Sequence, residues 1–299
     1  TITLGTTTNA LGGTVAFTTA GTAGNVVIDN GTTGLDLAAS TINGTLTATG
    51  GATAGIVDSG NVAVAGNVTL TTDAGNGVIN MGTLQQSAGD LILVTNGNGA
   101  ATVVNNAAID FGTSNVGGAL DVTASAGTIT QNGGALTVAG TSAFTTSTND
   151  QAITLSNTTN ALTGAVAFTT GGTTGNVVID NGTTGLDLAA STISGTLTAT
   201  GGASAGIVDS GNVAVAGNVT LTTDAGNGVI NMGTLQQSAG DLILVTNGTG
   251  AATVVNNAAI DFGTSNVGGA LDVTASAGTI TQNGGALTVA GTSAFTTST

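Results

Sequence analysis

The pattern that decides the fold is Gly66-Asn67-Val68-Thr69-Leu70-Thr71. A glycine opens this stretch, and apolar side chains then alternate with polar ones, so one face of an extended strand is dry and the other is wet. Strands that begin in this way follow six glycines in the first half of the chain: Gly13, Gly44, Gly66, Gly89, Gly118 and Gly140. The steps between these glycines are similar, apart from two longer ones after Gly13 and Gly89, which suits one solenoid turn per glycine.

The chain contains one long sequence twice. Residues 1–148 and 152–299 differ at ten of 148 aligned positions, for example Asn43 against Ser194 and Asn98 against Thr249. Near-identical copies of this length are typical of a repeat array. We therefore predict one continuous solenoid cut from a longer array, with residues 1–151 as the first copy and residues 152–299 as the second.

Each glycine-led unit holds further short apolar strands, such as 26–28 and 35–37, and turns rich in Asn, Asp and Gly separate them. The chain has no Pro, which agrees with a ladder in which every coil donates N–H groups to the next. We predict an all-β fold, a right-handed parallel β-helix (β-solenoid). It would have about 25 residues per rung and about six rungs per 151-residue repeat, each roughly triangular, with extra loops near residues 18–40 and 95–117.

The composition excludes several classes of partner. There is no Lys, Arg or His, all 15 acidic residues are Asp, and the net charge is −15. Nucleic acid binding needs basic side chains that replace phosphate counterions, and an anionic membrane surface would repel the chain. No stretch reaches the roughly 18 apolar residues of a membrane span. We expect no nucleic acid partner and no direct membrane insertion.

The chain lacks most of the residue types that enzymes use for catalysis. His, Cys, Lys, Tyr and Glu are absent, so no Ser–His or Cys–His pair can form. Paired Asp residues could hydrolyse a glycoside, but Asp29, Asp58 and Asp121 recur in the second copy, as duplicated scaffold positions do. We expect no enzyme, no catalytic residue and no cofactor-binding residue.

One oxygen-rich turn could bind a metal. It reads Asp73-Ala74-Gly75-Asn76-Gly77 and recurs at residues 224–228. Asp and Asn oxygens suit Ca²⁺, but the spacing is not that of an EF-hand. The sequence leaves two interpretations, a solvated turn or a weak calcium site at Asp73, Asn76, Asp224 and Asn227, and it predicts no other cofactor.

Several stretches resemble the repeats of filamentous-haemagglutinin-like exoproteins, the giant adhesins of two-partner secretion. They are residues 66–71, 127–133, 134–140 and 152–157, and the resemblance extends over both copies. It implies a right-handed parallel β-helix that leaves the cell through an outer-membrane secretion partner. It also implies an extracellular location on the bacterial cell surface.

Two functions follow from these observations. The first is the structural shaft of a secreted adhesin, which holds a binding tip away from the cell. The second is a self-assembling extracellular fibre, sheath or surface layer. In both cases the expected partners are further repeats of the same chain, or neighbouring copies, that stack end to end.

Overall fold

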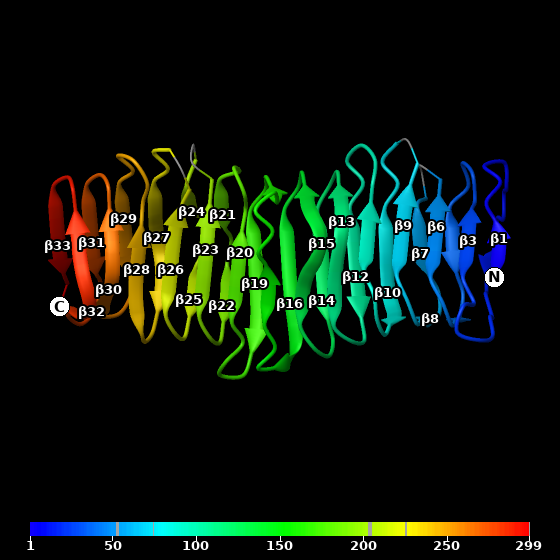
Figure 1. The fold of residues 1–299 in the computed structure, drawn as a ribbon, viewed down its shortest axis with the longest axis horizontal. Helices are drawn as coiled ribbons and strands as arrows, with labels where there is room; N and C mark the ends of the chain where they lie inside the picture. The colour runs from blue at the N-terminus through cyan, green and yellow to red at the C-terminus, as the bar shows by residue number, and fades with distance from the viewer. Residues whose placement is uncertain (52–53, 74, 203–204, 225, 299) are drawn as a thin grey trace. The chain divides into compact units, whose positions relative to one another are not determined.

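The computed structural model describes residues 1–51, 54–73, 75–202, 205–224 and 226–298 (Figure 1). These residues form 33 strands and no helix, so none of them belongs to a helix that could cross a membrane. The paired strands run parallel in stacked coils, and the fold is a β-solenoid of about 13 turns. The chain divides into two compact units, Thr1–Ser147 and Thr148–Thr299.

Unit 1 has two sheets, and successive coils add a strand to each. Its first sheet contains β1 (Ile2–Leu4), β3 (Val26–Asp29), β6 (Leu46–Gly50), β9 (Val68–Thr72), β11 (Leu91–Val94), β13 (Ile109–Val116) and β15 (Ile129–Val138). Its second sheet contains β2 (Thr14–Val15), β4 (Leu35–Leu37), β5 (Ser40–Ile42), β7 (Ile56–Asp58), β8 (Val62–Val64), β10 (Ile79–Gln86), β12 (Ala101–Asn105), β14 (Leu120–Ala124) and β16 (Ser142–Asn149).

Unit 2 repeats this arrangement. Its first sheet contains β17 (Ile153–Leu155), β20 (Val177–Asp180), β23 (Leu197–Gly201), β26 (Val219–Thr223), β28 (Asp241–Val245), β30 (Ile260–Val267) and β32 (Ile280–Val289). Its second sheet contains β19 (Val166–Gly171), β21 (Leu186–Leu188), β22 (Ser191–Ile193), β24 (Ile207–Asp209), β25 (Val213–Val215), β27 (Ile230–Gln237), β29 (Ala252–Asn256), β31 (Leu271–Ala275) and β33 (Ser293–Thr297). The short strand β18 (Ala161–Leu162) completes the unit.

The strands of each coil belong to two sheets, whereas the sequence predicts three short strands per coil on three faces. The long strand β10 pairs with β7 through Ile79 and Asn80, and with β8 through Leu84 to Gln86. The second and third expected strands are therefore two segments of one sheet. The parallel strands are confirmed, whereas the right-handed sense of the coil stays a prediction.

The coils are shorter and more numerous than the glycine spacing indicated. In-register partners of neighbouring coils lie closer in sequence than the expected spacing of about 25 residues. Leu120 is the partner of Ala101, and even the longest steps, such as that from Ile2 to Val26, fall short of the expected spacing. Seven strands stand in the first sheet of each unit, so a copy holds close to seven coils, more than the six expected.

A change of sheet explains the miscount. The strands after Gly44, Gly66 and Gly89 are β6, β9 and β11 of the first sheet. Those after Gly13, Gly118 and Gly140 are β2, β14 and β16 of the second. The two long glycine steps are thus each one and a half turns, and not single turns with the extra loops expected near residues 18–40 and 95–117.

Each copy is itself built from two half-copies. Strands β3, β6 and β9 of the first sheet correspond to β12, β14 and β16 of the second, half a copy later in the chain. Strands β4 and β5 of the second sheet correspond to β13 of the first. A half-copy therefore spans three and a half coils, and its equivalent strands exchange sheets.

The core consists of inward-facing columns of like side chains. Val26, Leu46, Val68 and Leu91 are in register in successive coils and are all fully buried. Burial of a large apolar side chain stabilises a fold by about 1.5–3 kcal/mol. Each coil therefore gains its stability mainly from its two neighbours, as expected of a solenoid.

Buried polar side chains close the turns. Asn105 is 0% exposed, its Oδ1 accepts from the Gln86 N–H at 2.8 Å, and its Nδ2 donates to the carbonyls of Gln86 and Ala108. Asn30, its half-copy equivalent, makes the same bonds to Leu11 and Gly34. These amides satisfy main-chain groups that the sheets leave unpaired at the turn.

Candidate functional site

The predicted calcium residues lie in turns that the chain itself uses. Asn76 Oδ1 accepts the Asn98 N–H at 2.8 Å, and Asn227 Oδ1 accepts the Thr249 N–H at 2.9 Å. Ala74 and Ala225, which belong to the same turns, lie outside the described residues. No group of three or more Asp side chains that could hold a metal occurs among the described residues. Calcium binding at Asp73, Asn76, Asp224 and Asn227 stays a prediction.

Asp224 has an acidic neighbour that sequence reasoning did not connect with it. Burial raises the pKa of Asp180, and the negative charge of Asp224 adds to this increase, while a hydrogen bond from the Gly182 N–H opposes it. The two carboxyl groups are brought together because β20 is two coils before the turn at Asp224, and coils stack in register. Two carboxylates alone provide too few oxygens for Ca²⁺, which takes roughly six to eight.

Several carboxylates are compensated by N–H and O–H groups of the following coil, namely those of Asp58, Asp110, Asp150, Asp209 and Asp261. Asp58 accepts from the main-chain N–H groups of Gly82 and Thr83, both at 2.8 Å, and from the Thr83 hydroxyl. Main-chain hydrogen bonds from Thr173 and Thr174 lower the pKa of Asp150. This is the compensation that a chain without Lys, Arg or His requires, and it ties successive coils together.

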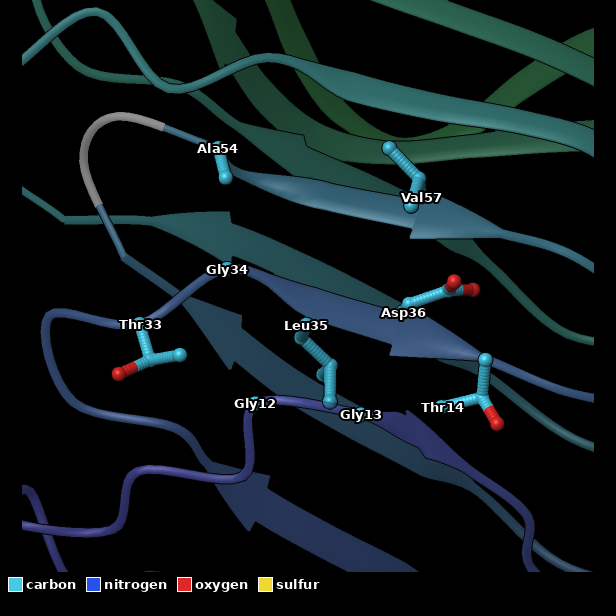
Figure 2. Close-up of a pocket in the computed structure, with 9 residues that line it drawn as sticks. All are labelled: Gly12, Gly13, Thr14, Thr33, Gly34, Leu35, Asp36, Ala54 and Val57. Carbon is cyan, nitrogen blue, oxygen red and sulfur yellow. The ribbon is translucent and has the colours of Figure 1, made fainter.

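Asp36 lacks this compensation, and it borders a surface hollow (Figure 2). The hollow has a volume of about 440 Å³. Its lining consists of Gly12, Gly13, Thr14, Thr33, Gly34, Leu35, Asp36, Ala54 and Val57. Asp36 stands between Thr14 of the preceding coil and Val57 of the following one. Its Oδ1 is buried without a hydrogen-bond partner.

Unit 2 has a similar hollow around Asp187, in which Thr163 stands at the position of Gly12. Its volume is about 340 Å³, and its lining includes Gly185, Ala205 and Val208 at the positions of Gly34, Ala54 and Val57. Asp187 Oδ1 is again buried without a partner. Neither Asp was predicted to belong to a site, although the repeated Leu-Asp-Leu at 35–37 and 186–188 is a signal for a shared environment.

A family model described as "Repeats of unknown function (DUF5649)" matches residues 23–99, 98–169, 174–246 and 249–299. These four matches cover most of the chain. The chain belongs to this repeat family. The first two DUF5649 matches start at positions 23 and 98, which are half a copy apart, so one DUF5649 repeat corresponds to three and a half coils. No curated protein and no solved structure matches the chain.

Proposed function

We propose that this chain is part of the structural shaft of a secreted, cell-surface bacterial adhesin, and that it holds a binding tip away from the cell. The observation that carries the proposal is the ladder of in-register parallel strands, in which each coil packs on the next and the same coils recur in a second copy. Main-chain ladders and apolar columns resist bending because every coil would lose register with its neighbours.

The resemblance to filamentous-haemagglutinin-like exoproteins supports the same proposal. It rests on the glycine-led phrases at residues 66–71 and 127–140, and it adds an outer-membrane secretion partner and an extracellular location. The role is mechanical, so the proposal includes no enzyme activity and no cofactor.

The test is to change the length of the shaft in the intact surface protein. Seven coils at about 4.8 Å each give a rise of about 34 Å per copy. Deleting one 151-residue copy should bring the tip about 34 Å closer to the cell, measured by electron microscopy of a labelled tip, while adhesion per tip is unchanged. An unchanged tip distance would contradict the shaft.

The alternative is a self-assembling fibre, sheath or surface layer. In it the coils of neighbouring molecules would stack end to end by strand addition. The chain length found after isolated filaments are denatured decides between the two. A shaft yields one chain that runs the length of the filament, whereas an end-to-end fibre yields many short chains.

A further inference from the structure

The same unsatisfied acceptor occurs at equivalent places in both units. Among the described side chains, only Asp36 Oδ1, Asp187 Oδ1 and Ser142 Oγ are buried without a hydrogen-bond partner. A carboxylate oxygen removed from water without a donor is far costlier than a hydroxyl in the same position. Two of the three atoms are equivalent carboxylate oxygens, and both belong to the hollows described above.

The half-copies show how such an Asp is satisfied elsewhere in the chain. Asp110, the equivalent of Asp36, pairs in register with Thr130 of the next coil. Its Oδ1 accepts from the Thr130 hydroxyl and from the Asn132 N–H, each at 3.0 Å. Its Oδ2 accepts from Asn132 Nδ2 at 2.8 Å. Asp261 in unit 2 has the same partners in Thr281 and Asn283.

These donors are missing at Asp36. Val57 occupies the register position of Thr130, so a methyl group replaces the hydroxyl. Ser59 stands at the position of Asn132, and its N–H donates to the Leu37 carbonyl at 3.0 Å. Val208 and Ser210 repeat both substitutions beside Asp187. The acid is kept while its internal partners are removed, and this happens identically in both copies.

The surroundings define the kind of donor that fits. Val57 and Ala54 form an apolar wall of the hollow. Gly34 and Gly13 line it without side chains, and the carboxyl group of Asp36 is its one charged group. Because Oδ1 is buried, a ligand in the hollow would approach Asp36 through its other carboxyl oxygen, Oδ2. A single reachable oxygen suits a compact ammonium better than a planar guanidinium, which prefers both oxygens of a carboxylate. It provides far too few ligands for Ca²⁺.

We propose that each hollow binds an alkylammonium group, which is a primary amine on an aliphatic stem. The ammonium would donate to the carboxylate of Asp36 or Asp187, and the methylene stem would lie against Val57 or Val208. The chain has no Lys of its own, so the amine comes from another molecule, either as a lysine side chain of a partner protein or as a free polyamine. The net charge of −15 attracts both.

The test uses the 299-residue chain, amide chemical shifts, and n-butylammonium as the probe, with NaCl at matched ionic strength as the reference. We expect saturable shifts at Gly34, Asp36, Gly185 and Asp187, with one binding site in each unit. Asp36→Asn together with Asp187→Asn should weaken binding at least tenfold. The matched control, Asp121→Asn with Asp272→Asn, removes the same charge from the same sheet of each unit and should leave binding unchanged.

A second pair of variants keeps Asp36 and Asp187 and places a hydroxyl donor beside each of them. Val57→Thr with Val208→Thr copies the arrangement at Asp110, so it should weaken butylammonium binding and raise the thermal midpoint. If NaCl produces the same shifts, or if the Asp variants bind as the parent does, the hollows hold only water and the proposal is wrong.

The source of the amine is settled in the same titration. A lysine-containing peptide that binds more tightly than butylammonium, and loses binding when the lysine is acetylated, assigns the site to a partner protein. Spermidine that binds more tightly than the peptide assigns it to free polyamines.

Discussion

At the scale of single residues, buried Asn side chains form hydrogen bonds with main-chain groups at the turns, as capping side chains do at helix ends. Asn105 and Asn30 each connect two coils through both their oxygen and their nitrogen, and both are completely buried. Removing such a side chain leaves several main-chain groups unpaired in an environment without water.

Asn105→Ala should therefore lower the free energy of unfolding by about 2–3 kcal/mol, measured by urea denaturation. The chain offers a natural control: Asn98→Thr copies the residue at Thr249, lies on the surface and should change stability by less than about 0.5 kcal/mol. Equal losses for the two variants would contradict the role given to Asn105.

The pH dependence of stability follows from carboxylates held by main-chain donors. Hydrogen bonds from Thr173 and Thr174 lower the pKa of Asp150 below its ordinary value of 3.8. Those from Asn283 lower the pKa of Asp261 in the same direction. A lowered folded-state pKa stabilises the fold above pH 3.8, and this contribution is lost as the pH falls through the folded-state value.

Asp150→Asn tests this directly. Asp150 is the non-glycine residue with positive φ, 61°, among those described, and Asn tolerates this conformation. The variant should have a lower thermal midpoint than the parent at pH 7, and the difference should shrink below pH 3.8. A difference that stays constant from pH 7 to pH 2 would show that charge at Asp150 is irrelevant.

At the scale of strands, the same side chain occurs at Phe144 with a following coil and at Phe295 in the last strand of the 299 residues. The Phe144 ring in β16 contacts Phe111 edge-on at 6.2 Å, and the Phe295 ring in β33 contacts Phe262 in the same way at 6.1 Å. Phe144 is fully buried, whereas Phe295 is 49% exposed.

Phe144→Ala should cost about 3–5 kcal/mol, as for a buried aromatic side chain. Phe295→Ala should cost clearly less, because half of the ring is already in water. Chemical denaturation of both variants at low protein concentration measures the difference. If both lose the same stability, Phe295 is covered in solution by another coil.

Strand position and type could be predicted from the sequence because alternation of apolar and polar residues has period two in any strand. The inward column of Val68 and Leu70 follows from that rule. The number of coils could not be predicted in this way. A glycine precedes strands of both sheets, so the glycine spacing does not show to which sheet a strand belongs. Comparing Leu35-Asp36-Leu37 with Ile109-Asp110-Phe111 would have shown the half-copy.

The site was less predictable than the fold. The turn residues Asp73 and Asn76 were conspicuous as oxygen-rich sequence, but Asn76 serves its own turn. Asp36 looked like any outward acid between two leucines. Its environment depends on Val57, which is distant in sequence but adjacent across the ladder, so only the register reveals that its donor is missing.

At the scale of the whole molecule, charge opposes self-association. With 15 Asp and no basic side chain, two molecules repel each other, and salt screens that repulsion within about 10 Å at 0.1 M. Apolar contact through Phe295 is unaffected by screening. Raising NaCl from 20 mM to 1 M should therefore increase association, measured by analytical ultracentrifugation.

Phe295→Asp is the control for where the molecules meet. It should abolish the salt-induced association while leaving the circular dichroism of the sheets unchanged, because the side chain is already half exposed. Association that decreases with salt, or that survives this substitution, would place the contact on another surface.

Because equivalent strands exchange sheets from one half-copy to the next, the orientation of a coil depends on whether an even or an odd number of half-copies precedes it. Inserting or deleting one DUF5649 repeat inside a unit would turn every later coil of that unit by half a revolution, so a side chain that faced one way would face the opposite way. An even number of repeats restores the original orientation. Recombination that preserves the outward face of later coils must therefore add or remove repeats in pairs, and the long period of this chain is such a pair.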